Sequence, residues 1–498
     1  MPGSLLVAGT TSDAGKSVVT AGVCRLLSRR GVKVAPFKAQ NMSNNSMVTA
    51  AGAEIGRAQW VQAVAAGAEP EPAMNPVLLK PSSDRRSHVV VMGEPAGRLE
   101  ANEYAGGRAH LAEAAFAAYD DLRSRYDVVV CEGAGGIAEI NLRAWDYVNL
   151  GLAQHDAIPT VVVADIDRGG VFAQLYGSLA LLDRADQALV AGFVVNKFRG
   201  DVSLLAPGTT ELERLTGRPV LGVLPWQHGL WLDSEDAVAL DQRPLPRDAG
   251  DALRVAVLAF PRISNFTDVD ALSLEPDVDV RFASRPEDVD AADLVVLPGT
   301  RSTLGDLAWA RERGLDEAVR RVAASGRHVL GICGGCQMLG HHIADPAGVE
   351  GDPGSRADGL GLLDITTTFG ADKALALVSD TWDGHPVGGY VIHHGRITTG
   401  PAAEPFLDGA ATGGVRGTMW HGSLEHDAFR RAVLTDAARA AGRTTFVPDP
   451  TLTFAEARMR RLDLLADLVE EHIGGDRLVE LIDGGAPSGL PFVPAGPR

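Results

Sequence analysis

Residues 9–17 read GTTSDAGKS, and this motif gives the strongest indication of the fold of the first half of the chain. An apolar run, Ser4–Ala8, leads into it, and a segment with leucine and valine at helical spacing, Lys16–Arg29, follows it. A glycine-containing turn between a buried strand and a helix lets backbone N–H groups approach phosphate oxygens closely. The sequence therefore predicts a phosphate loop that binds a nucleotide; a plain glycine-rich turn is the alternative.

The candidate nucleotide-binding residues of this loop are Thr11, Gly15, Lys16 and Ser17. The Lys16 ammonium can reach the outer phosphates, and the Ser17 hydroxyl is placed to ligate Mg²⁺ at the start of the helix. The spacing departs from G-x-x-x-x-G-K-[ST], because Gly9 comes one position early and Thr10 stands at the usual place of the first glycine.

Further apolar runs recur through the first half, at residues 32–37, 127–131, 160–164, 189–195 and 220–224. Most are continuously apolar rather than alternating, as expected of parallel strands buried on both faces. The segments between them, such as Leu111–Arg125, have apolar residues at helical spacing. This alternation predicts an α/β fold with a doubly wound sheet.

Residues 233–252 have a different texture, acidic and proline-containing without periodicity, which indicates a linker. After it, apolar runs return at 254–260, 278–283, 294–297 and 327–332. We therefore predict a P-loop domain at 1–232, a second doubly wound α/β domain at 253–440, and a helical extension with a tail at 441–498. In the extension, Phe454–Ile473 reads as a packing helix, and the tail from Gly484 is expected to fray.

The composition restricts the class of partner. The chain has 498 residues, 46 Lys and Arg against 64 Asp and Glu, and a formal net charge of −18. Such a surface repels phosphate backbones and anionic lipids, so we expect neither nucleic-acid nor membrane binding. The four cysteines do not form a disulfide framework in a chain of this length, and no export signal is evident, so a cytoplasmic protein is expected.

Polar side chains follow several of the predicted strands. Glu132 ends one strand, where an acid beside a phosphate loop can hold Mg²⁺ directly or through water. Asn196 ends another, where its amide could read the nucleotide base. The loop PFKAQNMSNNS at residues 36–46 leaves the same edge of the sheet. We expect its Lys38, Asn41 and Asn44 to face the phosphate site and bind an anionic substrate; a solvated loop is the alternative.

The second domain contains GICGGCQ at residues 331–337. A buried strand that ends at Cys333 and continues into small residues predicts a sharp turn that exposes the thiol as a nucleophile. The start of the following helix favours the thiolate. A buried core cysteine is the alternative. Cys336 is interpreted as packing, with a CxxC redox or metal site as its rival.

A thiol nucleophile needs a base, and three histidines are candidates: His393, His394 and His421. His421 follows a strand-like run, so it could lie at the sheet edge beside Cys333, but spacing alone does not choose among the three. His341 and His342 are expected on the helix after the elbow, at the surface. Gly299 ends a strand where backbone N–H groups could stabilise an oxyanion.

Together these motifs resemble one known family. GICGGCQ is similar to the class I glutamine amidotransferase motif G-x-C-x-G-x-Q, and GTTSDAGKS with CEGAGG resembles dethiobiotin synthetase-like P-loop ligases. The ordered set PFKAQNMSNNS, EIGRAQ, MNPVLLKP, EGAGGIAEINL, DIDRGGVFA and NKFRGD resembles the cobyric acid synthase family over nearly the whole chain.

The resemblance implies a flavodoxin-like glutaminase domain behind the P-loop domain. It also implies ATP- and glutamine-dependent amidation of the b, d, e and g carboxylates of adenosylcobyrinic acid a,c-diamide, giving adenosylcobyric acid in cobalamin biosynthesis. ATP, Mg²⁺, glutamine and a corrinoid are then the small-molecule partners. By the family pattern, Cys333 is the glutaminase nucleophile and His421 its base. The chain has His-Gly-Ser-Leu-Glu at 421–425 in place of His-Pro-Glu, so Glu425 is doubtful as a third catalytic residue.

Two rivals belong to other classes. A CTP synthase also joins a P-loop ligase to a glutaminase, but the amide-rich loop and MNPVLLKP are not expected in it. A partitioning-type P-loop ATPase switch would need no thiol elbow and carries an early lysine where this chain has Thr11. Because ammonia is protonated readily in water, the amidase interpretation also predicts a sheltered route between the two domains. The sequence does not give the oligomeric state.

Overall fold

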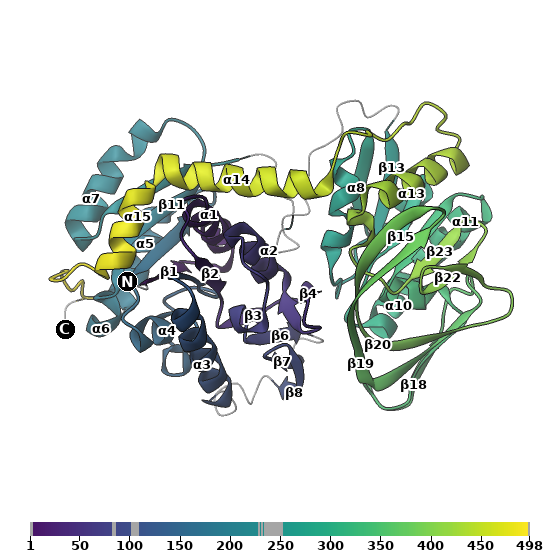
Figure 1. Ribbon diagram of the computed structural model, residues 1–498, viewed down its shortest axis with the longest axis horizontal. Coiled ribbons are helices and arrows are strands. Elements are labelled where there is room, and N and C mark those ends of the chain that lie inside the picture. Colours follow the sequence, from purple (N-terminus) through teal and green to yellow (C-terminus); the bar gives the residue numbers. More distant parts are fainter. Residues whose placement is uncertain are drawn as a thin grey trace.

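The computed structural model describes residues 3–81, 86–100, 109–227, 230, 233 and 252–496. It has two α/β halves side by side, joined along the top by one long helix (Figure 1). The predicted fold class, two doubly wound domains, is confirmed. The predicted linker, apart from Asp233 and Ala252, lies outside the described residues.

The N-terminal half is built on a six-stranded parallel sheet of order β12-β11-β10-β1-β9-β2. Its strands coincide with the predicted apolar runs, and both faces are covered by helices. The main elements are β1 (Gly3–Gly9), α1 (Lys16–Arg29), β2 (Val34–Phe37), α2 (Arg57–Ala66), α3 (Ala109–Arg125), β9 (Val128–Glu132), α4 (Leu150–His155), β10 (Thr160–Asp165), α5 (Val171–Leu181), α6 (Arg184–Gln187), β11 (Val190–Phe198), α7 (Ala206–Thr216) and β12 (Val220–Pro225).

Between β2 and α3 the chain builds small sheets that the sequence did not predict. They lie on the side of this half that faces the C-terminal half (Figure 1). Their strands are β3 (Gln40–Met42), β4 (Ser46–Val48), β5 (Glu54–Gly56), β6 (Val77–Pro81), β7 (Arg86–Val91) and β8 (Glu94–Glu100). The amide-rich loop therefore runs from the main sheet toward the other half.

The C-terminal half has a seven-stranded sheet of order β14-β13-β15-β16-β23-β22-β21. Its first five strands are parallel, and their order is 2-1-3-4-5 when these five alone are numbered along the chain, which is that of flavodoxin-like folds. The elements are β13 (Leu253–Leu258), α8 (Asp270–Leu274), β14 (Val278–Ala283), α9 (Pro286–Asp290), β15 (Leu294–Leu297), α10 (Thr303–Glu312), α11 (Leu315–Ala324), β16 (His328–Ile332), α12 (Gly334–Leu339), β21 (Glu404–Phe406), β22 (Gly409–Thr412), β23 (Val415–Thr418) and α13 (Asp427–Ala440).

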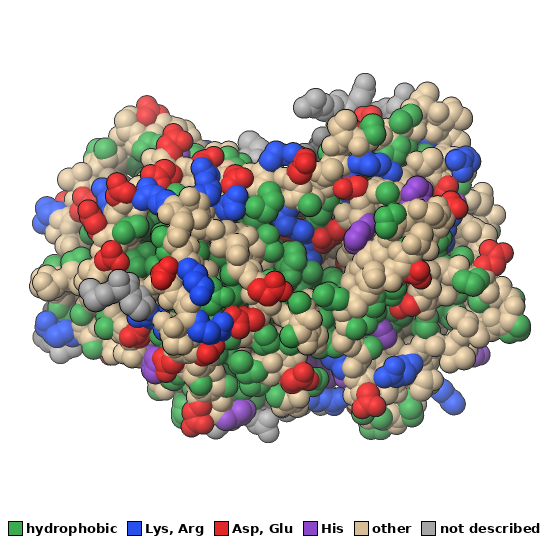
Figure 2. Space-filling model, viewed as in Figure 1, with side chains coloured by type: hydrophobic (Ala, Val, Ile, Leu, Met, Phe, Trp, Pro, Cys, Tyr) green, Lys and Arg blue, Asp and Glu red, His purple; other side chains and the backbone are tan. Residues whose placement is uncertain are grey.

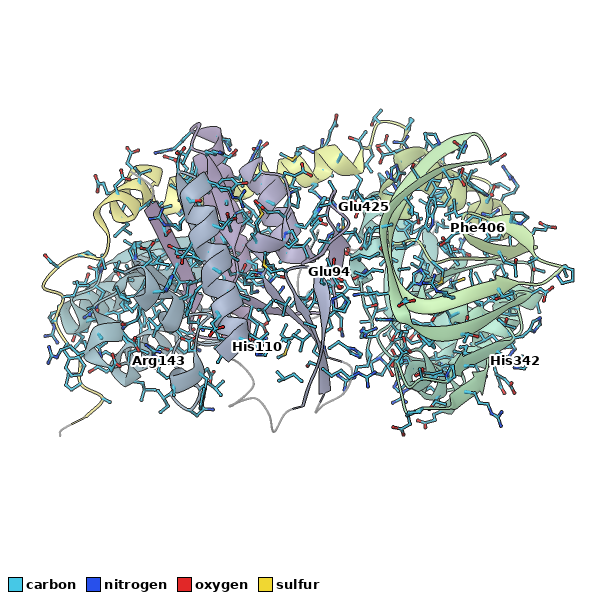
Figure 3. The ribbon with its side chains drawn as sticks, turned by 60° about the horizontal axis from the view of Figure 1, so that its bottom comes forward. Glu94, His110, Arg143, His342, Phe406 and Glu425 are labelled. Atoms are coloured by element: carbon cyan, nitrogen blue, oxygen red, sulfur yellow. The ribbon has the colours of Figure 1, made fainter. Side chains whose placement is uncertain are left out.

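A second sheet in this half contains two long antiparallel strands, β19 (Ile365–Trp382) and β20 (His385–Thr399), with β17 (His342–Asp345) and β18 (Ser355–Asp358) beside them. None of these strands was predicted from the sequence. The prediction that His341 and His342 lie on a helix is wrong, since His342 begins β17. Both side chains are exposed, as expected. His342 lies on the far side of this half from the junction between the halves (Figure 3).

The predicted packing helix is α14 (Phe454–His472), and α15 (Gly475–Gly484) follows it. Phe454 belongs to the core of the C-terminal half, whereas Leu462, Leu465 and Val469 belong to the core around α1. One helix therefore anchors in both cores. The expectation of a frayed tail is wrong for Val493, whose backbone forms two hydrogen bonds with the buried Gln187 side chain.

A buried ion cluster also joins the halves. Arg57 of α2 and Arg458 of α14 both bind the carboxylates of Asp233 and Glu425, and we call these four residues the junction cluster. Arg458 Nε lies 2.6 Å from Asp233 Oδ2, and Arg57 Nη2 lies 2.7 Å from Glu425 Oε1. Glu425 lies where the two halves face each other (Figure 3).

Acidic and basic side chains are interspersed over the face seen in Figure 2, with no large field of one sign. Among the described residues, no helix has the length and apolar character needed to cross a membrane.

Candidate active sites

The loop after β1 is closed around the Lys16 ammonium. Lys16 Nζ donates to the backbone carbonyls of Thr11, Ser12 and Gly135 at 2.9, 3.0 and 3.1 Å. Gly15 has a φ of 99°, and a Cβ there would collide with the Asn196 amide, so only glycine fits the turn. Thr11 contributes its carbonyl oxygen, and its side chain is exposed.

Glu132, at the end of β9, is the buried acid beside this loop. It accepts hydrogen bonds from Ser17 Oγ at 2.8 Å and Lys38 Nζ at 2.9 Å, and from the Gln62 side-chain amide. Glu132 and Lys38 form an ion pair with almost no solvent contact. Among the described residues no group of three or more His, Cys, Asp or Glu side chains is placed to hold a metal ion. The Ser17 hydroxyl and the Glu132 carboxylate, both oxygen donors, lie together at this point.

Two cavities meet at the phosphate loop, and Ser12, Lys16 and Ser17 line both. The first, of about 240 Å³, also contains Asn196 and Trp226. The second, of about 420 Å³, contains Lys38, Asn41, Glu132 and Asn149. A nucleotide in the first cavity would thus direct its outer phosphates toward the second.

The Asn196 amide, which was predicted to bind the nucleotide base, forms a hydrogen bond with the phosphate loop itself. Its Nδ2 donates to the carbonyl of Ala14 at 2.9 Å, and this bond holds the phosphate loop against the end of β11. The side chain still lines the first cavity, where its Oδ1 is the remaining polar atom. Asn41 lines the second cavity. Its Nδ2 donates a hydrogen bond to Gln59 Oε1 at a distance of 3.0 Å.

The placement of Asn44 corrects the sequence analysis. Lys38 and Asn41 face the phosphate site as expected, but Asn44 lines a separate small cavity that contains Cys333. The cause is the small sheet: the chain turns away from the phosphate loop after β3 and packs against the C-terminal half. There Asn45 Oδ1 accepts from the backbone N–H of Phe266. The amide-rich loop therefore touches both sites.

Cys333 occupies the predicted sharp turn between β16 and α12. Its backbone has φ 51° and ψ −111°, a strained conformation typical of a nucleophile on a strand-to-helix turn. The thiol is not exposed as predicted: Cys333 is buried, and it lines a small cavity rather than the open surface. The backbone N–H donates to Thr418 O at 2.7 Å, which fixes the end of β16 to β23. Cys336 is fully buried in α12 and packs in the core, as expected.

His421 follows β23 and hydrogen-bonds the Cys333 side chain. Its Nδ1 lies 2.7 Å from Asp268 Oδ2, and Asp268 Oδ1 accepts from the Gly422 N–H at 2.9 Å. Burial disfavours the imidazolium, but Asp268 and Cys333 favour it more strongly and raise the pKa of His421 to about 10. Tyr390 stacks on the ring at 5.4 Å between centroids.

Asp268 is the residue that the sequence analysis missed. It lies in a short 3₁₀ helix, Phe266–Val269, after β13, and precedes the thiol in the chain. Glu425, the doubtful acid, instead belongs to the junction cluster. The structure therefore brings together a Cys–His–Asp arrangement suited to nucleophilic attack on an amide.

The other candidate histidines lie nearby, and no carboxylate of the described residues binds either ring. His393 and His394 line the thiol cavity, and burial lowers the pKa of each to about 4. Gly299 lies directly beside the His421 ring, since a Cβ added there would stand 2.8 Å from His421 Cε1. This position is compatible with the predicted oxyanion role, which stays a prediction.

The thiol cavity also carries charged groups of both signs. Lys80 reaches it from the N-terminal half, whereas Arg301, Glu350 and Lys373 come from the C-terminal half. Burial raises the pKa of Glu350 to about 7, although Arg301 opposes the shift. Glu350 also accepts from the backbone N–H of Thr303 at 2.7 Å. A zwitterionic amino acid would find both cationic and anionic partners around the thiol.

Two family models match this chain, one in each half. Residues 5–237 match the model of the CobQ/CobB/MinD/ParA nucleotide binding domain, and residues 254–429 match that of the CobB/CobQ-like glutamine amidotransferase domain. A solved structure described as a glutamine amidotransferase covers 38% of this chain and 98% of its own at 20% identity, with a TM-score of 0.29.

Full-length relatives are more similar. The cobyric acid synthase of Mycolicibacterium gilvum is 64% identical over 496 residues, covering 99% of both chains. That of Mycobacterium ulcerans is 62% identical over 500 residues, covering 100% of both.

The fold and sites thus define a glutamine-dependent amide ligase, a phosphate-loop domain joined to a glutamine amidotransferase domain. The chain belongs to the cobyric acid synthase family.

Proposed function

We propose that this enzyme amidates the b, d, e and g carboxylates of adenosylcobyrinic acid a,c-diamide in cobalamin biosynthesis, with ATP and glutamine, giving adenosylcobyric acid. The observation that carries the proposal is the pairing of the phosphate loop with the Cys333 site through one loop, residues 36–46, which contributes to both cavities. We also propose the domain limits 1–232 and 253–440, with the remainder as linker and extension.

The ligase chemistry follows from the poor reactivity of a carboxylate toward ammonia. A substrate carboxylate oxygen attacks the γ-phosphorus of ATP, ADP leaves, and the acyl phosphate that forms is displaced by ammonia with release of phosphate. Lys16 neutralises the transferred phosphoryl group. Ser17 and Glu132 would hold Mg²⁺, which supplies further charge neutralisation when bound.

The glutaminase chemistry uses the Cys–His–Asp arrangement. The Cys333 sulfur attacks the glutamine side-chain carbonyl, and the carbon–nitrogen bond breaks as His421 gives a proton to the departing ammonia. Water then hydrolyses the thioester and releases glutamate. Asp268 holds His421 in the orientation that this proton transfer needs.

The apolar side chains at the mouth of the second cavity suit a corrinoid. Met42, Leu142 and Trp145 line this cavity, and each has more than a third of its side chain exposed, at 51, 39 and 48%. Exposed apolar side chains gathered at a cavity mouth favour an apolar ligand face. The polar wall below them, with Lys38 and Asn41, fits the carboxylates at the macrocycle edge.

A sheltered ammonia route is supported by unpartnered amide atoms between the two sites. Asn44 Oδ1, Gln59 Nε2 and Gln62 Oε1 are buried, and none has a hydrogen-bond partner among the described residues. Asn44 lines the thiol cavity, Gln59 binds Asn41, and Gln62 binds Glu132 at the phosphate site. Buried polar atoms without partners are rare, and ammonia can both donate to and accept from such groups.

The experiment that tests this function is mass spectrometry of adenosylcobyrinic acid a,c-diamide incubated with the enzyme, ATP, Mg²⁺ and glutamine. Four successive amidations are the expected result. An unchanged corrinoid together with conversion of UTP to CTP would instead establish a nucleotide amidase.

A further inference from the structure

Helix α14 places one arginine in the nucleotide cavity of the other half. Arg461 lines the first cavity together with Gly15, Lys16 and Ser17 of the phosphate loop. It comes from a helix whose start, Phe454, is packed in the core of the C-terminal half. Neither matched family model covers this helix, because the matches end at residues 237 and 429.

Arg461 Nε and Nη1 are buried, and neither forms a hydrogen bond within the described part of the chain. The nearby carboxylate of Asp233 is already bound by Arg57 and Arg458 through both of its oxygens. Burial lowers the pKa of Arg461, although the charges of Asp233 and Asp270 oppose the shift.

The neighbouring arginines of helix α14 differ from Arg461 in having carboxylate partners. Arg458, one turn earlier, binds Asp233 and Glu425 in the junction cluster. Arg460 is exposed and lies 3.5 Å from Glu456, one turn away on the helix surface. A buried, unpaired guanidinium is costly to the folded state, and such a group facing a cavity is typical of a ligand-binding position.

We propose that Arg461 is a nucleotide-binding residue whose guanidinium donates hydrogen bonds to the phosphate oxygens of the nucleoside triphosphate in this cavity. The inference rests on the proposed use of ATP. Planar guanidinium donors match phosphate oxygens, and the phosphate loop in the same cavity supplies the second contact to the same ligand. The helix that anchors in the glutaminase half thereby completes the nucleotide site of the ligase half.

The test compares Arg461→Met with the matched control Arg460→Met by calorimetric titration of the full-length protein with ATP and with inorganic tripolyphosphate. We expect Arg461→Met to weaken both ligands at least about tenfold, the range of a charged hydrogen bond. Arg460→Met should change each affinity by less than about twofold, as for an exposed ion pair.

Thermal unfolding supplies a readout that a structural role would not give. Without nucleotide, Arg461→Met should melt no lower than the wild type, because it removes a buried unpaired charge, and its melting temperature should rise less on adding ATP. Arg461→Lys, which keeps the charge but not the paired donors, should bind with intermediate affinity. Wild-type affinity in Arg461→Met would overturn the inference, and so would weakened ATP binding with unchanged tripolyphosphate binding. A wild type that binds no ATP would instead refute the proposed function.

Discussion

His421 Nδ1 lies 2.7 Å from Asp268 Oδ2, although 153 residues separate them in the chain. Asp268 follows the first strand of the C-terminal half and His421 follows its last parallel strand. His421 reaches Cys333, and Asp268 reaches His421, because the carboxyl ends of parallel strands share one edge of the sheet. Both oxygens of Asp268 are used, on His421 and on the Gly422 N–H, so the carboxylate has a fixed orientation.

Asp268→Asn is expected to lower the glutaminase kcat by about 10³-fold, because an amide in this place favours the wrong imidazole tautomer and does not stabilise the imidazolium. Amidation with ammonium in place of glutamine should continue at close to the wild-type rate. Parallel assays of glutamate release and ammonia-dependent amide formation check both results.

The matched control for this substitution is Glu425→Gln, which removes the charge of the acid nearest to His421 in sequence. Glu425 binds Arg57 and Arg458 rather than the histidine, so the folded Glu425→Gln enzyme should keep glutaminase activity within about tenfold. If Glu425→Gln lost more glutaminase activity than Asp268→Asn, then Asp268 would not be the acid that supports His421.

The same pair predicts a pH dependence of stability. The pKa of His421 is raised to about 10 in the folded protein, above about 6.5 in an unfolded chain. The stabilisation by the His421–Asp268 pair is therefore complete below pH about 6.5 and is lost as the pH rises through 10. Denaturant unfolding at several pH values between about 6.5 and 10 should show the free energy of unfolding of the wild type falling toward that of Asp268→Asn. A constant difference in the free energy of unfolding across this pH range would contradict the ion pair.

The apolar rim of the second cavity predicts an effect on one substrate alone. Trp145→Ala should raise the KM for the corrinoid about tenfold through lost apolar contact, with little change in kcat or in glutaminase activity. Leu204→Ala serves as the control, because Leu204 is 79% exposed and lines none of the three cavities. Equal KM values for the two variants would place the corrinoid elsewhere.

The unpartnered amide atoms predict that a substitution can uncouple glutamine hydrolysis from amide formation while both reactions continue. Gln59→Leu should raise the ratio of glutamate released to amide formed above one, while ammonia-dependent amidation persists. Thr20→Val is the control, because Thr20 also has a buried unpartnered oxygen but lies in α1, away from the thiol cavity. A ratio of one in both variants would argue against a route past Gln59.

Much of the architecture was predictable because its signals are local. Buried parallel strands are continuously apolar, so the runs at 4–8 and 328–332 gave strands, and the phosphate loop and thiol elbow follow from residue order at a strand end. Exposed strands lack that signal. In β19, buried Thr367 and Phe369 alternate with exposed residues for only part of its length.

Contacts between distant segments were not predictable in this way. Asp268 carries no motif, and only the fold places it on His421. Asn44 shares a loop with Asn41, yet the small sheet after β3 directs it to the other site. Arg461 looks like any charged residue of an amphipathic helix until the packing of α14 on α1 carries it to the nucleotide cavity.

We propose that nitrogen released at Cys333 reaches the carboxylate activated at Lys16 without leaving the protein. The direct measurement is the isotope content of the amides formed from ¹⁵N-amide glutamine in a large excess of unlabelled ammonium, with adenosylcobyrinic acid a,c-diamide and ATP. We predict ¹⁵N in each new amide for the wild type and unlabelled amides for Cys333→Ala. Unlabelled amides in the wild type, with glutamate still released, would contradict the account.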